Sequence, residues 1–205
     1  YKNAKIFCST LTMGALKEDV MSENIYALLL LHSNTIKKVC EENEVFIVDL
    51  LKYKKTYSAN DYTTDSAAGG TALACGVKTK NGMVGMSPDS LPVNSVLAES
   101  AAKGKATGLV VTCSVTHATP ASFVAHQDNR SKDEEIAADF LKCPPDVFIG
   151  GGLKYFTKRD DDQNLLNALE KKGYVVAKSI EDVRKVNSGK LAGLLCNNHP
   201  EKVKH

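Results

Sequence analysis

Short apolar segments alternate with amphipathic ones along most of the chain, and this pattern predicts alternating strands and helices. Residues 109–111 are continuously apolar, which is typical of a parallel strand that is buried on both faces. The predicted fold is therefore α/β, with a mainly parallel sheet flanked by helices on both faces. Strands are predicted at residues 5–8, 45–51, 107–113, 146–149, 174–177 and 191–196.

Start and stop signals place three helices between these strands. Pro92 is predicted to open a helix that runs to Lys103 before Gly104, since proline favours a first turn and glycine an end. Ser131 and Glu134 have the spacing of a capping box before a helix over residues 136–141. A third helix is predicted over residues 162–172. Because no low-complexity linker interrupts the pattern, residues 1–205 are predicted to form a single α/β domain.

The composition of the chain argues against some kinds of function, such as nucleic-acid binding, but does not select one. Hydrophobic residues make up 43% of the chain and charged residues 24%, values that are ordinary for a globular protein. The net charge is +2 and no Lys/Arg-rich run stands out, so no nucleic-acid partner is expected. The longest apolar run, residues 26–31, is too short for a membrane span. The six cysteines form no CxxC pair, which disfavours a structural zinc site and leaves their disulfide state open.

Residues 60–72 are the richest candidate for chemistry. Small residues from Ala67 onward would let a helix begin close to its neighbours. Ser66 would then lie over free backbone N–H groups, where a phosphate or a phosphorylated serine is stabilised. The same pattern also suits a plain helix cap at Ser66 with Asp65 as an acidic neighbour.

A second candidate segment follows the apolar strand that ends near residue 113. His117 and Thr119 come directly after it, at the strand end where open α/β sheets place their ligands. Arg130 follows one predicted helix later, and its planar guanidinium can bind two phosphate oxygens at once. Taken separately, His117 also suits an ordinary hydrogen-bonded histidine.

Together these segments resemble the alkaline phosphatases. That family carries Thr-Asp-Ser-Ala-Ala followed by Gly-Val-Lys-Thr, matched here by residues 64–68 and 76–79. Its His-Ala-Thr-Pro-Ala run with a later His and Arg is matched by residues 117–130. Its Asp-Val…Gly-Gly-Gly segment is matched by residues 146–152. The resemblance is strong over residues 57–156 and weaker from there to residue 205.

The resemblance implies a role for each matched residue. Ser66 would be the zinc-activated nucleophile that forms a phosphoserine intermediate, and Arg130 would hold phosphate oxygens that bond to neither the attacking nor the leaving group. Asp65 would orient the Arg130 guanidinium. Thr119 would be a magnesium ligand, with His117 in the second shell of that metal. The implied cofactors are two Zn²⁺ ions about 4 Å apart and one Mg²⁺, and the implied partner is a phosphate monoester.

The sequence departs from the family pattern in two places. The family strand that ends in Gly-Asp-Gly-Met-Gly is matched by residues 6–14, where Thr10 or Leu11 stands in place of the metal-bridging Asp. The remaining zinc ligands of the family lie in a C-terminal half with no counterpart here. His199 and His205 have no metal-site spacing and are interpreted as surface residues. We therefore expect either a fragment of a larger phosphatase domain or a degenerate relative.

Two functional hypotheses follow from the resemblance. The first is metal-assisted hydrolysis of phosphate monoesters, and the alternative is a non-catalytic phosphate-binding relative or an inactive fragment without metal ligands. A Ser-His-Asp hydrolase fits poorly, because Ser66 lacks the G-x-S-x-G elbow. The family also implies a secreted or periplasmic homodimer. The chain begins with Tyr1 and not with Met, so we expect a processed or trimmed N-terminus from which any signal peptide is gone.

Overall fold

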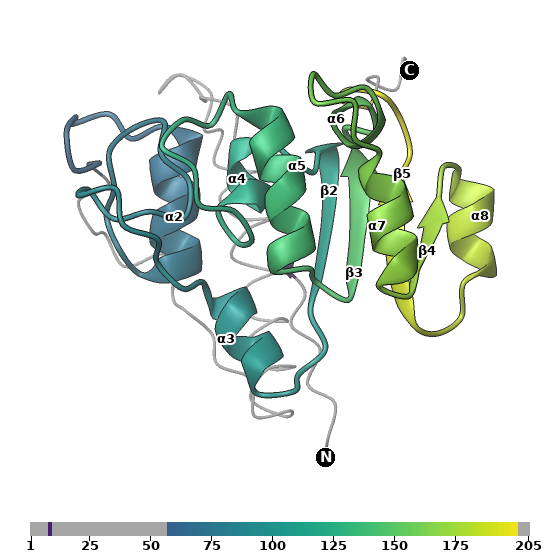
Figure 1. Ribbon diagram of the computed structural model, residues 1–205. Helices are drawn as coiled ribbons and strands as arrows, with labels where there is room; N and C mark the ends of the chain where they lie inside the picture. The colour runs from purple at the N-terminus through teal and green to yellow at the C-terminus, as the bar shows by residue number, and fades with distance from the viewer. Residues whose placement is uncertain (1–7, 10–56, 201–205) are drawn as a thin grey trace, which may run out of the picture. The chain divides into compact units, whose positions relative to one another are not determined.

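A computed structural model describes residues 8–9 and 57–200, all of which belong to one compact unit of the chain. Five strands form a parallel sheet in the order β1-β2-β3-β5-β4 (Figure 1). The strands are β1 (Cys8–Ser9), β2 (Gly108–Ser114), β3 (Val147–Gly151), β4 (Tyr174–Ala177) and β5 (Lys190–Leu194). The predicted strand over residues 45–51 lies outside the described residues, as does most of the one over residues 5–8.

The described helices are short and connect successive strands. They are α2 (Ser66–Cys75), α3 (Val96–Ala102), α4 (Ala118–Ala121), α5 (Asp133–Lys142), α6 (Lys154–Thr157), α7 (Leu165–Lys171) and α8 (Ile180–Lys185). Within the described part of the chain, no helix has the length and apolar character that a membrane span requires.

Helices cover both faces of the sheet, as the sequence predicts. Phe148 of β3 pairs in register with Ala192 of β5, and both belong to the buried cluster beneath α5, α6 and α7. Figure 1 shows α5 and α7 together on this side of the strands. Gly193, the next residue of β5, points to the opposite face because side chains alternate along a strand. A Cβ at Gly193 would lie 3.3 Å from the Val183 side chain, so α8 covers that second face.

The start of α3 differs from the prediction. Pro92 forms an antiparallel bridge with Met86, and the helix begins only at Val96. Ser95 provides the N-cap, because its Oγ accepts a hydrogen bond from the Ala98 N–H at 3.1 Å. The same hydroxyl donates to the Phe123 carbonyl at 2.5 Å. A tertiary contact that the local sequence does not reveal therefore helps to fix this helix start.

The predicted capping box before α5 is also wrong. The N-cap of α5 is Lys132, which makes no side-chain capping bond, and the helix begins at Asp133. Glu134 instead accepts the backbone N–H of Asp160 at 3.0 Å. Similarly, α7 begins at Leu165, with Asn164 capping the Leu166 N–H, and not at residue 162. At the first helix, a side chain expected to cap the helix instead bonds to a neighbouring loop. At the second, the residues expected in the first turn lie before the helix.

Candidate active site

The start of α2 places Ser66 at a helix N-terminus that Asp65 caps. Asp65 has an extended backbone, and its Oδ1 accepts the Ala68 N–H at 2.8 Å. Ser66 is the first residue of the helix and is half-buried. Its hydroxyl is therefore not used for capping, which resolves the alternative that the sequence left open in favour of Asp65 as the cap.

Asp65 also holds the turn that follows α2 in the chain. Its backbone N–H donates to Asn81 Oδ1 at 3.0 Å, and its Oδ2 accepts the Gly82 N–H at 2.9 Å. Gly82 has a φ of 87°, a conformation that side chains disfavour, so glycine suits this turn. One carboxylate thus joins the helix start to the turn at residues 80–83.

Arg130 reaches both Ser66 and Asp65. Its Nη1 donates to Ser66 Oγ at 2.7 Å and forms an ion pair with Asp65 Oδ2 at 3.4 Å. Its backbone N–H donates to the Gly82 carbonyl at 2.7 Å. Both charged side chains keep more than a quarter of their surface exposed, 29% for Arg130 and 27% for Asp65. The guanidinium is therefore oriented by its partners and still accessible to an anion.

His117 is the third partner of Arg130, with its Nε2 3.2 Å from Arg130 Nη2. A guanidinium can only donate, so Nε2 accepts and the neutral imidazole carries its proton on Nδ1. Burial lowers the pKa of His117, and the positive charge of Arg130 lowers it further. Nδ1 is buried and has no hydrogen-bond partner among the described residues. His117 therefore presents a buried N–H donor that a metal-bound water or a ligand oxygen could satisfy.

Thr119 lies close to α2 because a glycine faces it. A Cβ at Gly70 would be 3.3 Å from the Thr119 Cα and 2.8 Å from Ser122 Oγ, so α4 approaches the helix that carries Ser66 more closely than a larger residue would allow. Thr119 is half-buried, and its hydroxyl makes no hydrogen bond within the described part of the chain. Thr119 of α4 therefore lies against α2, the helix that carries Ser66, and its hydroxyl is available to a ligand.

The residues needed to complete a metal centre are not found together. Among residues 8–9 and 57–200, no group of three His, Cys, Asp or Glu side chains converges as a metal site. Thr10 and Leu11, one of which stands in place of the bridging carboxylate, both lie outside the described residues. The hydroxyls of Ser66 and Thr119 could each supply one oxygen. The described donors alone therefore do not fit a complete zinc or magnesium site.

Two residues that the sequence analysis did not select support the site. Asp139 is 3% exposed and accepts hydrogen bonds from the His126 N–H at 3.0 Å and Gln127 Nε2 at 2.8 Å. It thereby holds the segment that leads to Arg130. The only sequence feature that could have indicated this role is an acidic residue within the otherwise apolar run 136–141.

His199 was expected at the surface and is exposed, but its ring also contacts the His117 ring, with a centroid separation of 5.5 Å. His205 lies outside the described residues.

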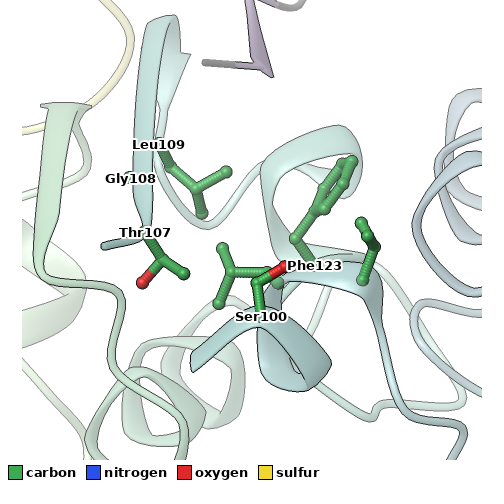
Figure 2. Close-up of a pocket in the computed structure, with 7 residues that line it drawn as sticks. Ser100, Thr107, Gly108, Leu109 and Phe123 are labelled. Atoms are coloured by element: carbon green, nitrogen blue, oxygen red, sulfur yellow. The ribbon is translucent and has the colours of Figure 1, made fainter. Parts of the chain in front are cut away.

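Two pockets in the described part of the chain lie away from Ser66. The first is apolar, has a volume of about 30 Å³, and is lined by Ser100, Thr107, Gly108, Leu109 and Phe123 among others (Figure 2). That volume suits a single water-sized group and not a phosphate monoester. The second lies beside Ser131 and is lined mainly by acidic side chains, which would repel a phosphate dianion. Neither of these two pockets suits a phosphate monoester, whereas the accessible guanidinium of Arg130 at the start of α2 can bind an anion.

Comparisons with known proteins show which family the chain resembles in sequence and fold. The family model described as alkaline phosphatase matches residues 19–202. Alkaline phosphatase 4 of Bacillus subtilis is 39% identical over 144 residues, which are 67% of this chain and 31% of that enzyme. The alkaline phosphatase of the Antarctic bacterium TAB5 superposes with a TM-score of 0.68 at 41% identity, over 71% of this chain and 43% of that one. A variant of the TAB5 enzyme has Mg bound in its M3 site. The chain spans about a third of the length of the curated relatives that it matches.

Proposed function

The chain belongs to the alkaline phosphatase family, and on this premise we propose that the protein hydrolyses phosphate monoesters through a phosphoserine formed at Ser66. The observation that carries the proposal is the contact of Arg130 Nη1 with Ser66 Oγ at 2.7 Å, beside the carboxylate of Asp65. A fixed cation next to a hydroxyl at a helix N-terminus suits a group that must bind and receive a phosphoryl group. Because the chain spans only part of its relatives, the activity is proposed for the whole protein.

Each residue has a role in the proposed reaction. Arg130 binds two non-bridging oxygens of the phosphoryl group, and the N-terminus of α2 stabilises their negative charge. Ser66 Oγ loses its proton and attacks phosphorus, the Oγ–P bond forms, and the bond to the leaving oxygen breaks as that oxygen takes up a proton and departs as the alcohol. Water then attacks the phosphoserine, the Oγ–P bond breaks, a proton returns to Ser66 Oγ, and inorganic phosphate is released. Asp65 keeps the guanidinium aligned through both steps, since positioning and charge stabilisation dominate phosphoryl transfer.

Two zinc ions and one magnesium ion are the proposed cofactors. Ser66 and Thr119 would each contribute a ligand oxygen, and the His117 Nδ1–H would donate to the magnesium shell. When bound, zinc would favour the ionised form of a serine hydroxyl. The described residues do not complete this ligand set, so no step above is assigned to a metal. The family resemblance also supports a homodimer and a secreted or periplasmic setting as parts of the proposal.

Hydrolysis of p-nitrophenyl phosphate in the presence of Zn²⁺ and Mg²⁺ tests the proposal. We expect Ser66→Ala to abolish turnover, because no nucleophile remains at the start of α2. Ser131→Ala is the matched control, since the Ser131 side chain is exposed and makes no hydrogen bond in the described part of the chain. Turnover by the Ser66→Ala variant at the wild-type rate would contradict the phosphoserine mechanism.

A second candidate is a phosphate-binding relative, or fragment, without catalytic activity. It is favoured by one observation: the side chains of Ser66, Asp65 and His117 orient Arg130, so an anion site at this guanidinium needs no metal ligand. This candidate predicts no turnover, together with phosphate binding that a chelator leaves unchanged. If chelation removed phosphate binding, the non-catalytic alternative would be excluded.

A further inference from the structure

The loop that follows β5 is held over the carboxyl ends of the neighbouring strands. The Gly152 N–H donates to the carbonyls of Cys196 and Asn198, at 3.0 and 2.8 Å. A Cβ at Gly151 would lie 2.0 Å from the Asn198 carbonyl oxygen, so only glycine permits this approach. The loop is therefore fixed by backbone contacts, and so is the residue that comes next, His199.

His199 is anchored by one of its ring nitrogens and uses its ring to contact His117. Its Nδ1 accepts the backbone N–H of Ser114 at 3.0 Å, a contact between residues 85 positions apart. The His199 ring meets the His117 ring edge to face, with a centroid separation of 5.5 Å and an interplanar angle of 77°. This is a favourable geometry for aromatic rings, and the anchor on β2 holds His199 in it.

The hydrogen bonding of the His117 side chain does not by itself fix the orientation of the imidazole ring, so a second contact is needed. Within the described residues, the only hydrogen bond of its side chain joins Nε2 to Arg130 Nη2, and Nδ1 has no partner. Rotation about the second side-chain torsion of a histidine is broad, so one hydrogen bond does not fix the ring plane. The ring of His199 supplies the second constraint. Arg130, oriented in part by His117, in turn contacts Ser66.

We propose that His199 is a positioning residue, which fixes the imidazole of His117 so that its Nε2 faces Arg130 and the guanidinium stays on Ser66. This inference rests on the proposed function, because it assigns a purpose to the Arg130–Ser66 contact. His199 is exposed and lies on a loop after the last described strand, so its removal leaves the packed core intact.

The test measures the ring ¹⁵N shifts of His117 in the 205-residue chain at about pH 8, where a histidine of ordinary or lowered pKa is neutral. In the wild type we expect one protonated nitrogen, Nδ1, and one unprotonated nitrogen, Nε2. In His199→Ala the two shifts should move toward each other, because a freed ring exchanges tautomers. Asn197→Ala is the matched control, since the Asn197 side chain makes no hydrogen bond in the described part of the chain.

His199→Asn separates the ring from the anchor. The Asn Oδ1 can accept the Ser114 N–H in place of Nδ1, so the loop stays attached while the ring is lost. We expect the His117 shifts in this variant to converge as in His199→Ala. Shifts of wild-type character in either His199 variant would overturn the proposal, because His117 would then be fixed without the second ring.

Affinity for inorganic phosphate gives a separate readout that distinguishes this inference from the proposed function. We expect both His199 variants to raise the phosphate Kd about two- to tenfold, the range that corresponds to loss of one aromatic pair. If Arg130→Ala weakens phosphate binding while the His199 variants do not, the positioning role is refuted and the proposed function stands. If Arg130→Ala has no effect on phosphate binding, the proposed function fails and the His117 shifts alone decide the inference. If the 205-residue chain does not bind phosphate, the His117 shifts likewise decide the inference.

Discussion

At the scale of single residues, the site depends on planar groups that each bind more than one partner. The Asp65 carboxylate caps α2, holds the Gly82 N–H and pairs with Arg130. The Arg130 guanidinium contacts Ser66, Asp65 and His117 from two nitrogens. A point charge cannot reproduce such a set of contacts, because it lacks the fixed fork of donors.

Arg130→Lys tests this point. Lysine keeps the positive charge but cannot contact Ser66, Asp65 and His117 together, so we expect inorganic phosphate to bind about tenfold more weakly, as expected for the loss of one charge-assisted hydrogen bond. Isothermal titration calorimetry would measure the change in Kd. Arg184→Lys is the control, since Arg184 is exposed on α8. Equal Kd values for Arg130→Lys and the wild type would show that charge alone suffices.

At the scale of elements, the close packing of α2 against α4 places Thr119 beside the helix of Ser66. Adjacent glycines in α2 differ in what surrounds them. A Cβ at Gly70 would lie 2.8 Å from Ser122 Oγ, whereas a Cβ at Gly69 would meet nothing within 4 Å. The two positions have the same helical backbone and therefore separate the effect of packing from that of helix propensity.

Gly70→Ala should lower the free energy of unfolding by about 1–3 kcal/mol, because overpacking outweighs the better helix propensity of alanine. Gly69→Ala should raise it by about 0.5–1 kcal/mol, since only the propensity term remains. Urea denaturation of both variants measures the difference. The same stability change in both variants would mean that α2 and α4 are not closely packed at Gly70.

The strands and motif residues could be predicted from the sequence better than the helix starts. A run such as residues 109–111 is apolar by itself, so β2 is visible locally, and the predicted residues 174–177 coincide with β4. The start of α3 depends on the Ser95 contact with Phe123. The Glu134 carboxylate accepts the Asp160 N–H and does not cap α5. Such contacts join distant segments, and local patterns do not encode them.

At the scale of the whole molecule, the contact of His199 with His117 depends on the order of the strands. Because β5 lies beside β3, and β3 beside β2, the loop after β5 reaches the carboxyl end of β2. Neither residue spacing nor composition carries that order. The sequence could therefore indicate Ser66, Arg130 and His117 through their motifs, while His199 could only be interpreted as a surface residue.

The stability of the whole chain should fall at high pH through Tyr174. Burial raises the pKa of Tyr174 from 10.0 to about 12, and its hydroxyl donates to the Pro145 carbonyl at 2.5 Å. The folded state therefore keeps the proton longer than the unfolded state does. The resulting stabilisation is complete below pH 10 and is lost as the pH rises toward about 12.

Urea denaturation at several pH values, with Tyr174→Phe as the comparison, measures this dependence. The phenylalanine variant should lose less free energy of unfolding than the wild type between pH 10 and 12. Identical slopes for the two proteins would show that Tyr174 does not contribute to the alkaline loss of stability.

In the proposed mechanism, Ser66 receives the phosphoryl group of the substrate. Peptide mapping by mass spectrometry tests this step, after the protein is incubated with Zn²⁺, Mg²⁺ and a phosphate monoester and quenched in acid. We predict one phosphoryl group on the peptide that contains Ser66, and none on that peptide in the Ser66→Ala variant. A phosphoryl group on another residue, or an unmodified Ser66 in a sample that hydrolyses the substrate, would contradict a phosphoserine mechanism at Ser66.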